Sequence, residues 1–142
     1  RFVVFKGVSS SGNINWSQYI VTEFLKNVDI NEHIERISEI YEKKARTMYE
    51  KMKECFHPSV EYTMPQGGMF IWAKLPDTVK ATDFCLDAAE NLGIAVVPGN
   101  DFFYGSPEDC SYIRLNFSKP SLEDIRYGME KLGELTYRYC GR

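Results

Sequence analysis

Residues 112–118 are the part of the sequence best suited to binding chemistry. They read Tyr-Ile-Arg-Leu-Asn-Phe-Ser, so apolar and polar side chains alternate. A period of two indicates a strand with one buried face and one polar face. Arg114 is on the polar face, where its planar guanidinium can bind a carboxylate or a phosphate through two parallel hydrogen bonds. On the strand alone, an arginine on a solvated sheet face is the more common situation.

A complete catalytic set is not evident in the rest of the sequence. The two histidines, His33 and His57, flank a predicted amphipathic helix, so we expect them at the surface rather than in a nucleophilic triad. The glutamates cluster on helix faces, which is typical of a solvated surface. Residues 66–68, residues 98–100 and the aromatic turn after them are loops that border a cleft if they lie near Arg114. Together they amount to half of a binding site.

The spacing of apolar residues predicts the elements that position this half-site. A short helix is expected at about 15–26 and a long one at 31–56. Two further helices are expected to begin near residues 81 and 121, the last with Ser121 as N-cap. Strands are expected at 60–63, 69–75, 94–97 and 111–118. The segment 69–75 has few polar positions, so we expect it to be covered on both faces. This order predicts a two-layer α+β fold, with a small, mainly antiparallel sheet packed on helices and a long N-terminal spine helix.

The amino-acid composition limits the classes of protein to which the chain can belong. The chain has 142 residues, 44% of them hydrophobic, a net charge of -3 and no basic run, which argues against nucleic-acid binding. No apolar run is long enough for a membrane span, and the N-terminus lacks a signal-peptide layout. The four cysteines are far apart, which favours reduced thiols in a cytoplasmic protein over a zinc site. Because the chain opens mid-pattern without an initiator Met, we expect it to be a piece of a longer protein.

Three segments resemble one family when they are taken together. They are Pro-Gln-Gly-Gly-Met-Phe-Ile-Trp at 65–72, Gly-Ile-Ala-Val-Val-Pro-Gly at 93–99 with Phe102 beyond it, and the strand at 112–118. The pattern is similar to the C-terminal small domain of class I/II, fold-type I aminotransferases, which use pyridoxal 5'-phosphate (PLP). Within that family it resembles the subgroup of aminoadipate and kynurenine transaminases. The resemblance covers essentially the whole chain, with 1–30 as an inter-domain arm and short helix and 31–142 as the small domain.

The resemblance implies a function for the longer protein, namely transfer of an amino group between an amino acid and a 2-oxo acid in amino-acid metabolism. It implies that Arg114 holds the substrate α-carboxylate, and that Gly68, Pro98, Gly99 and Phe102 lie at the edge of the cleft. It also implies that the full-length protein is a homodimer. From the composition, we expect neither a membrane nor a nucleic acid as a partner of this chain.

The same resemblance implies that the PLP-binding residues are elsewhere. The Schiff-base lysine, the aspartate at the pyridine nitrogen and most phosphate ligands belong to the large domain, upstream of this chain. Neither Lys6 nor Arg1 has the flanking residues expected of the family's cofactor ligands. We therefore expect no cofactor-binding residue here, and no activity from this chain alone.

Other functions remain open at this level. An aminotransferase-like domain also serves as the ligand sensor of some transcription regulators, and β-eliminating lyases share the fold and the arginine. A stand-alone α+β interaction domain is a further alternative. The sequence upstream of the chain distinguishes among them.

Overall fold

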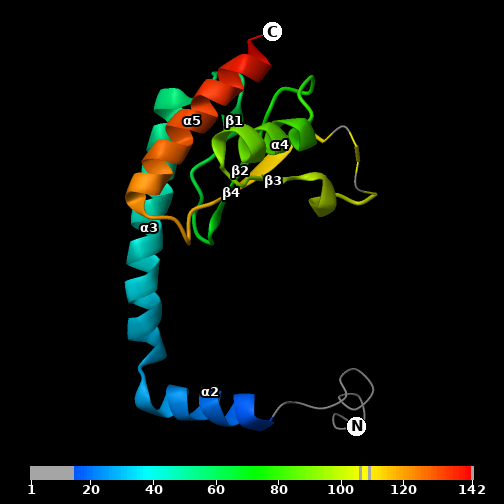
Figure 1. The fold of residues 1–142 in the computed structure, drawn as a ribbon. Coiled ribbons are helices and arrows are strands. Elements are labelled where there is room, and N and C mark those ends of the chain that lie inside the picture. Colours follow the sequence, from blue (N-terminus) through cyan, green and yellow to red (C-terminus); the bar gives the residue numbers. More distant parts are fainter. Residues whose placement is uncertain (1–14, 106, 109, 142) are drawn as a thin grey trace. The chain divides into compact units, whose positions relative to one another are not determined.

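The computed structural model describes residues 15–105, 107–108 and 110–141 (Figure 1). The chain divides into two compact units, Arg1–Ser38 and Glu39–Arg142, and the division falls inside a helix. The predicted division at residue 30 stays a prediction. The helices and strands are, in chain order, α2 Asn15–Asn27, α3 Ile30–Cys55, β1 Glu61–Tyr62, β2 Phe70–Lys74, α4 Ala81–Leu92, β3 Val97–Pro98, the 3-10 helix η1 Asn100–Phe102, β4 Tyr112–Asn116 and α5 Leu122–Cys140.

The first unit contains α2 and the start of α3. Asp29 caps α3, because its Oδ1 accepts a hydrogen bond from the backbone N–H of Asn31 at 2.8 Å. None of the residues of α2 is buried. Its apolar side chains are exposed to solvent, with Trp16 at 69% exposure.

The second unit is built on a four-stranded sheet in the order β1-β2-β4-β3. Its strand pairs are antiparallel, and the longest pairing joins β2 to β4, with Trp72 opposite Arg114. This confirms the predicted α+β class and the small antiparallel sheet. The long helix predicted over 31–56 is α3.

One face of the sheet carries the core. Ile71 and Ala73 of β2 and Ile113 and Leu115 of β4 are buried there. They belong to a single cluster that includes residues of the second half of α3, of α4 and of α5: Ala45, Met48, Met52, Phe84, Ala88, Ile125, Met129, Leu132 and Leu135. The sheet and the helices therefore form two layers, and burial of this cluster supplies the hydrophobic stabilisation of the unit.

Helix α5 is fixed at its start and along its length. Ser121 and Asp124 form a capping box, as the Ser-x-x-Asp spacing predicts. Further along, Gly133 allows close approach to the end of α3, since a Cβ there would lie 2.5 Å from the carbonyl oxygen of Cys55. The buried hydroxyl of Thr136 accepts a hydrogen bond from the backbone N–H of His57 at 2.9 Å.

Two strand predictions need correction. The strand expected at 94–97 is instead Val97–Pro98, which pairs with Arg114 and Ile113 of β4. Proline is tolerated there because β3 is at the edge of the sheet, where its missing N–H breaks no ladder. The segment 69–75 was expected to be covered on both faces, but Trp72 is 36% exposed. None of the helices in the described ranges is both long and apolar enough to cross a membrane.

Candidate carboxylate-binding site

Strand β4 presents Arg114 on the sheet face opposite the core. Its neighbours Ile113 and Leu115 are buried at 0% and 3% exposure, whereas Arg114 is half-buried on the other side. The strand lies between β2 and β3, and both neighbours pair with it at Arg114. The backbone of the arginine is therefore held from two directions.

The guanidinium of Arg114 lies over two aromatic rings. Its Cζ is 4.2 Å from the ring centre of Phe70 and 4.4 Å from that of Phe102. A guanidinium over a ring face is attracted by the negative potential of the ring. The Nε atom is buried and has no hydrogen-bond partner within the described residues.

Arg114 differs from the other half-buried basic side chains. Within the described residues, each half-buried lysine has a polar partner: Lys44 donates to the carbonyl oxygen of Ser118 at 2.8 Å, and Lys51, Lys74 and Lys131 form ion pairs with carboxylates. Arg114 has rings beside it and neither an ion pair nor a hydrogen bond from its side chain in that part of the chain. Arg114 Nε is thus a desolvated donor without a hydrogen-bond partner among the described residues, and such a group is costly in a folded protein.

The turn after β3 places Phe102 on Arg114. The backbone N–H of Gly99 donates to the carbonyl oxygen of Tyr112 at 2.7 Å, and the N–H of Phe102 donates to the oxygen of Gly99 at 3.0 Å. A Cβ on Gly99 would lie 2.8 Å from the Cβ of Tyr112. Only glycine permits this close approach to β4. The turn is therefore packed on Tyr112, which is two residues before Arg114 in β4.

Further aromatic rings pack next to Phe102 on the same sheet face. The Trp72 ring meets Phe102 edge-on at 5.6 Å between ring centres and stacks on Tyr112 at 5.6 Å. Phe103 lies 5.2 Å from Tyr112. Aromatic pairs at these separations hold one another's orientation. The site therefore offers a cation for an anionic group and an apolar surface beside it.

Lys74, another basic residue on this sheet face, is neutralised locally. Lys74 Nζ lies 3.0 Å from the carboxylate of Asp77. The hydrogen bond from Lys74 is the main cause that lowers the pKa of Asp77, and the same bond raises the pKa of Lys74. Lys74 is thus paired with Asp77, whereas Arg114 has no ion pair among the described residues.

The structure brings together most of the residues predicted for the site. Arg114, Pro98, Gly99 and Phe102 lie on β4 and on the turn packed against it. Gly68 is in the turn before β2 with φ of 80°, and a Cβ there would contact nothing within 4 Å. Its place at the cleft edge stays a prediction.

Sequence reasoning missed two residues of β2, Phe70 and Trp72. The signal was present, because Phe70, Trp72 and Lys74 alternate with buried residues. Pairing that alternation antiparallel to 112–116 places Trp72 opposite Arg114 and Phe70 on the diagonal from it.

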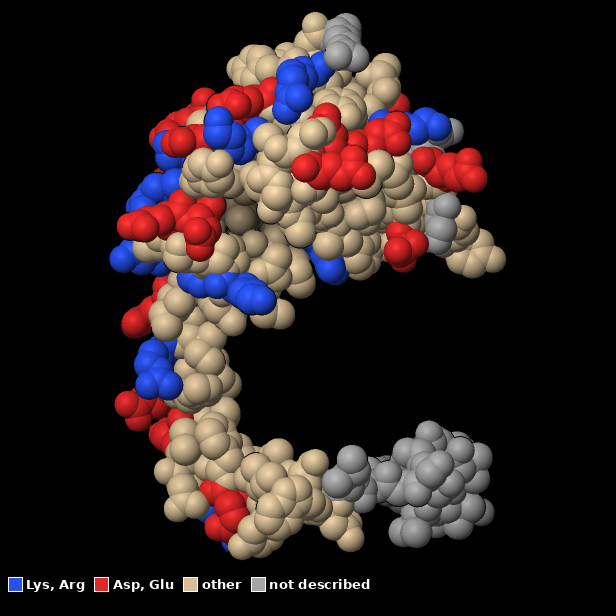
Figure 2. All heavy atoms as spheres, viewed as in Figure 1, with Lys and Arg blue, Asp and Glu red and all other residues tan. Residues whose placement is uncertain are grey.

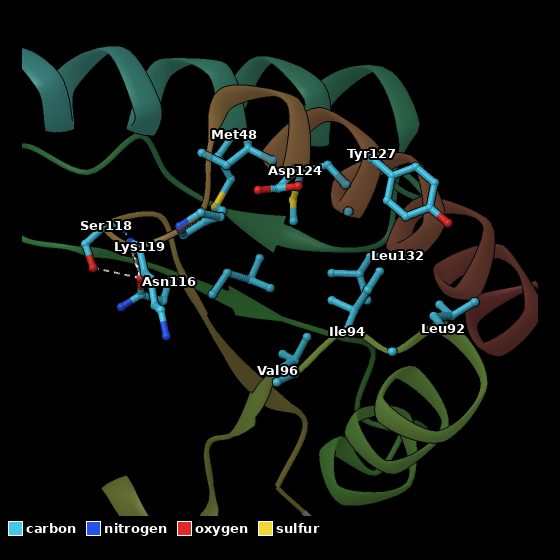
Figure 3. Close-up of a pocket in the computed structure, with 17 residues that line it drawn as sticks. Met48, Leu92, Ile94, Val96, Asn116, Ser118, Lys119, Asp124, Tyr127 and Leu132 are labelled. Carbon is cyan, nitrogen blue, oxygen red and sulfur yellow. Dashed lines mark hydrogen bonds between the residues drawn. The ribbon is translucent and has the colours of Figure 1, made fainter.

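A separate groove lies on the helical side of the sheet. It encloses about 630 Å³ and is lined by Met48 of α3, by residues 92–96 and by the first half of α5 (Figure 3). Leu115 borders it from the opposite face of β4 to Arg114. The groove is therefore not the site of the arginine.

The half-buried lysines of the described residues do not by themselves fit PLP. Capture of PLP by a protein uses a free lysine amine, and its phosphate needs a cradle of donors. The half-buried lysines already have partners, as above, and the exposed Lys26 pairs with Glu23. Lys6 and Arg1 lie outside the described residues. Their flanking residues in the sequence already argue against a role as cofactor ligands. The location of the cofactor ligands outside this chain stays a prediction.

Comparison with known proteins shows that the chain is similar to aminotransferases in sequence and in structure. The chain is 34% identical to aromatic-amino-acid aminotransferase 1 of Thermococcus litoralis over 84% of its own length and 28% of that protein. It superposes on the crystal structure of an α-aminoadipate aminotransferase from Thermus thermophilus, complexed with N-(5'-phosphopyridoxyl)-L-leucine, with a TM-score of 0.79 and 31% identity, covering 87% of this chain and 31% of that one. The chain is therefore similar in sequence and fold to one part of fold-type I aminotransferases.

Two further findings bear on this similarity, namely how much of each relative the chain covers and which other proteins it resembles. The chain spans less than a third of the length of these relatives, which agrees with a single domain of a two-domain protein. It is also 30% identical to the HTH-type transcriptional regulator NorG of Staphylococcus aureus, over 82% of this chain and 25% of the regulator. No protein-family model matches the chain.

Proposed function

We propose that the chain is the C-terminal small domain of a PLP-dependent aminotransferase, in which Arg114 binds the α-carboxylate of the amino-acid or 2-oxo-acid substrate. One observation carries the proposal. Arg114 is half-buried on a strand paired on both sides, its guanidinium lies over two rings, and its Nε has no hydrogen-bond partner in the described residues. A planar carboxylate satisfies this group through two parallel hydrogen bonds.

The large domain of the same polypeptide supplies PLP and its ligands in this proposal. When bound, PLP supplies the electron sink for chemistry at the substrate Cα. Arg114 contributes orientation, since a fixed carboxylate leaves rotation about one axis to be set by the rest of the site. The small domain alone is inactive, and the complete protein is a homodimer, as the family resemblance implies.

The proposed location is a reducing compartment, the cytoplasm. Cys55, Cys85, Cys110 and Cys140 are free thiols in the structure. The alternative function is a ligand-sensing domain of a transcription regulator, which the similarity to NorG supports. The two functions share the carboxylate site and differ in what precedes it.

The test uses the full-length protein loaded with PLP. Amino-group transfer from L-phenylalanine or L-2-aminoadipate to 2-oxoglutarate distinguishes an enzyme from a regulator without turnover. We expect Arg114→Ala to weaken binding of the amino donor by about 2–4 kcal/mol while PLP stays bound. The half-saturating concentration of the amino donor should rise accordingly. The matched control is Arg126→Ala on the exposed face of α5. An unchanged half-saturation in the Arg114 variant contradicts the assignment.

A further inference from the structure

We propose that Phe70 and Phe102 are positioning residues, which hold the guanidinium of Arg114 in its binding orientation before the ligand arrives. The inference rests on the proposed function and adds to it the way in which the arginine is kept in place. The two residues are named here the aromatic pair.

The contact geometry carries the first step. Both rings lie within 4.4 Å of the Arg114 Cζ, the separation at which the ring potential acts on the cation. Nε is buried without a hydrogen-bond partner in the described residues, so no polar bond sets the orientation of the group there. The aromatic pair therefore does the orienting that a carboxylate performs for most half-buried arginines, and leaves the hydrogen-bonding capacity free for the ligand.

The second step is that the aromatic pair is itself fixed. Phe70 is on β2, in the antiparallel ladder that also holds Arg114. Phe102 belongs to η1, whose turn is tied to β4 by the hydrogen bond from Gly99 to Tyr112 at 2.7 Å. Trp72 meets the Phe102 ring edge-on. A flexible arginine side chain thus lies against rings that have little freedom of their own.

The consequence for binding is entropic. An arginine loses considerable rotamer freedom when a ligand immobilises it, and a guanidinium already confined loses less. Loss of one ring should therefore weaken the binding of carboxylate ligands, and it should do so only by freeing the side chain of Arg114. The ring need not touch the ligand for this effect.

Phe102→Leu in the full-length, PLP-loaded protein tests the inference, because leucine keeps apolar bulk but has no ring face. Affinity is measured by titration with whichever of L-phenylalanine and L-2-aminoadipate binds the unaltered protein more tightly. We expect a loss of about three- to thirtyfold. Phe102→Tyr keeps a ring face and should restore most of the affinity. Tyr104→Leu removes an exposed aromatic of the same loop as the matched control.

The Arg114→Ala background separates positioning from other roles. If the aromatic pair acts through the arginine, Phe102→Leu and Phe70→Leu have no further effect once Arg114 is absent. An equal loss in both backgrounds overturns the inference, as does full affinity in Phe102→Leu while Arg114→Ala is impaired. If Arg114→Ala itself binds normally, the proposed carboxylate site is wrong, which is a different failure.

Discussion

At the scale of the residue, the site depends on an arginine whose partners are rings rather than carboxylates. Residue type and alternation predicted that Arg114 lies on a polar strand face, and the structure confirms the strand. The rings could not be predicted from the strand alone. Phe102 reaches Arg114 only because Gly99 packs on Tyr112, and that contact depends on tertiary geometry that short-range spacing does not contain.

Ser121 and Asp124 give a residue-scale prediction about pH. The hydrogen bond from the Ser121 hydroxyl is the main cause that lowers the pKa of Asp124. A lowered pKa in the folded state means that ionised Asp124 favours folding above its ordinary pKa of about 3.9, and that the contribution is lost as pH falls through the folded-state value. Ser121→Ala should reduce the free energy of unfolding more at about pH 7 than at about pH 2.5.

Chemical denaturation of the chain and its variant at the two pH values measures this difference. Some loss should remain in acid, because the Ser121 hydroxyl also accepts a hydrogen bond from the backbone N–H of Asp124, whatever the charge on the carboxyl group. An equal loss at both pH values would show that the ionised carboxylate has no part in the cap.

At the scale of the element, helix α5 contains two glycines with opposite requirements. A Cβ on Gly133 would approach the backbone of Cys55 to 2.5 Å, whereas a Cβ on Gly128 would meet nothing within 4 Å. The amphipathic spacing predicted α5 and its buried face, but it does not distinguish the two glycines. Only the crossing of α3 and α5 explains why residue 133 must be small.

Matched substitutions test that crossing. Gly133→Ala should lower the free energy of unfolding by about 1–3 kcal/mol, because the helices must separate to admit the methyl group. Gly128→Ala should raise it by about 0.5–1 kcal/mol through helix propensity, since the methyl group enters open space in the groove. The midpoints of urea unfolding check both signs, and destabilisation of similar size in the two variants would contradict the described contact.

At the scale of the whole molecule, the proposed carboxylate site has to be completed by residues of the proposed large domain. Acidic and basic side chains are interspersed along α3 and α5 in Figure 2, as expected for a solvated surface. On the first unit, α2 exposes an apolar face that includes Trp16 and Ile20. The periodicity of those residues predicted the helix but not its exposure, because burial depends on what packs against a helix.

The proposed location of the PLP ligands in the large domain predicts that the isolated chain does not retain PLP. Dialysis after incubation with PLP, followed by borohydride treatment and mass measurement of the chain, gives the stoichiometry of covalent attachment. We expect none at a defined position, in contrast to attachment at a single lysine in the full-length protein. Stoichiometric labelling of one lysine within residues 1–142 would place a cofactor ligand in this chain.

The measurement that tests the central claim most directly removes the two halves of the proposed contact in turn. The PLP-loaded full-length protein and its Arg114→Ala variant are each titrated with L-phenylalanine and with 2-phenylethylamine, which lacks the carboxylate. If Arg114 binds the α-carboxylate, the substitution weakens binding of the amino acid by about 2–4 kcal/mol and leaves that of the amine unchanged. Equal effects on the two ligands, or none on either, would contradict the account.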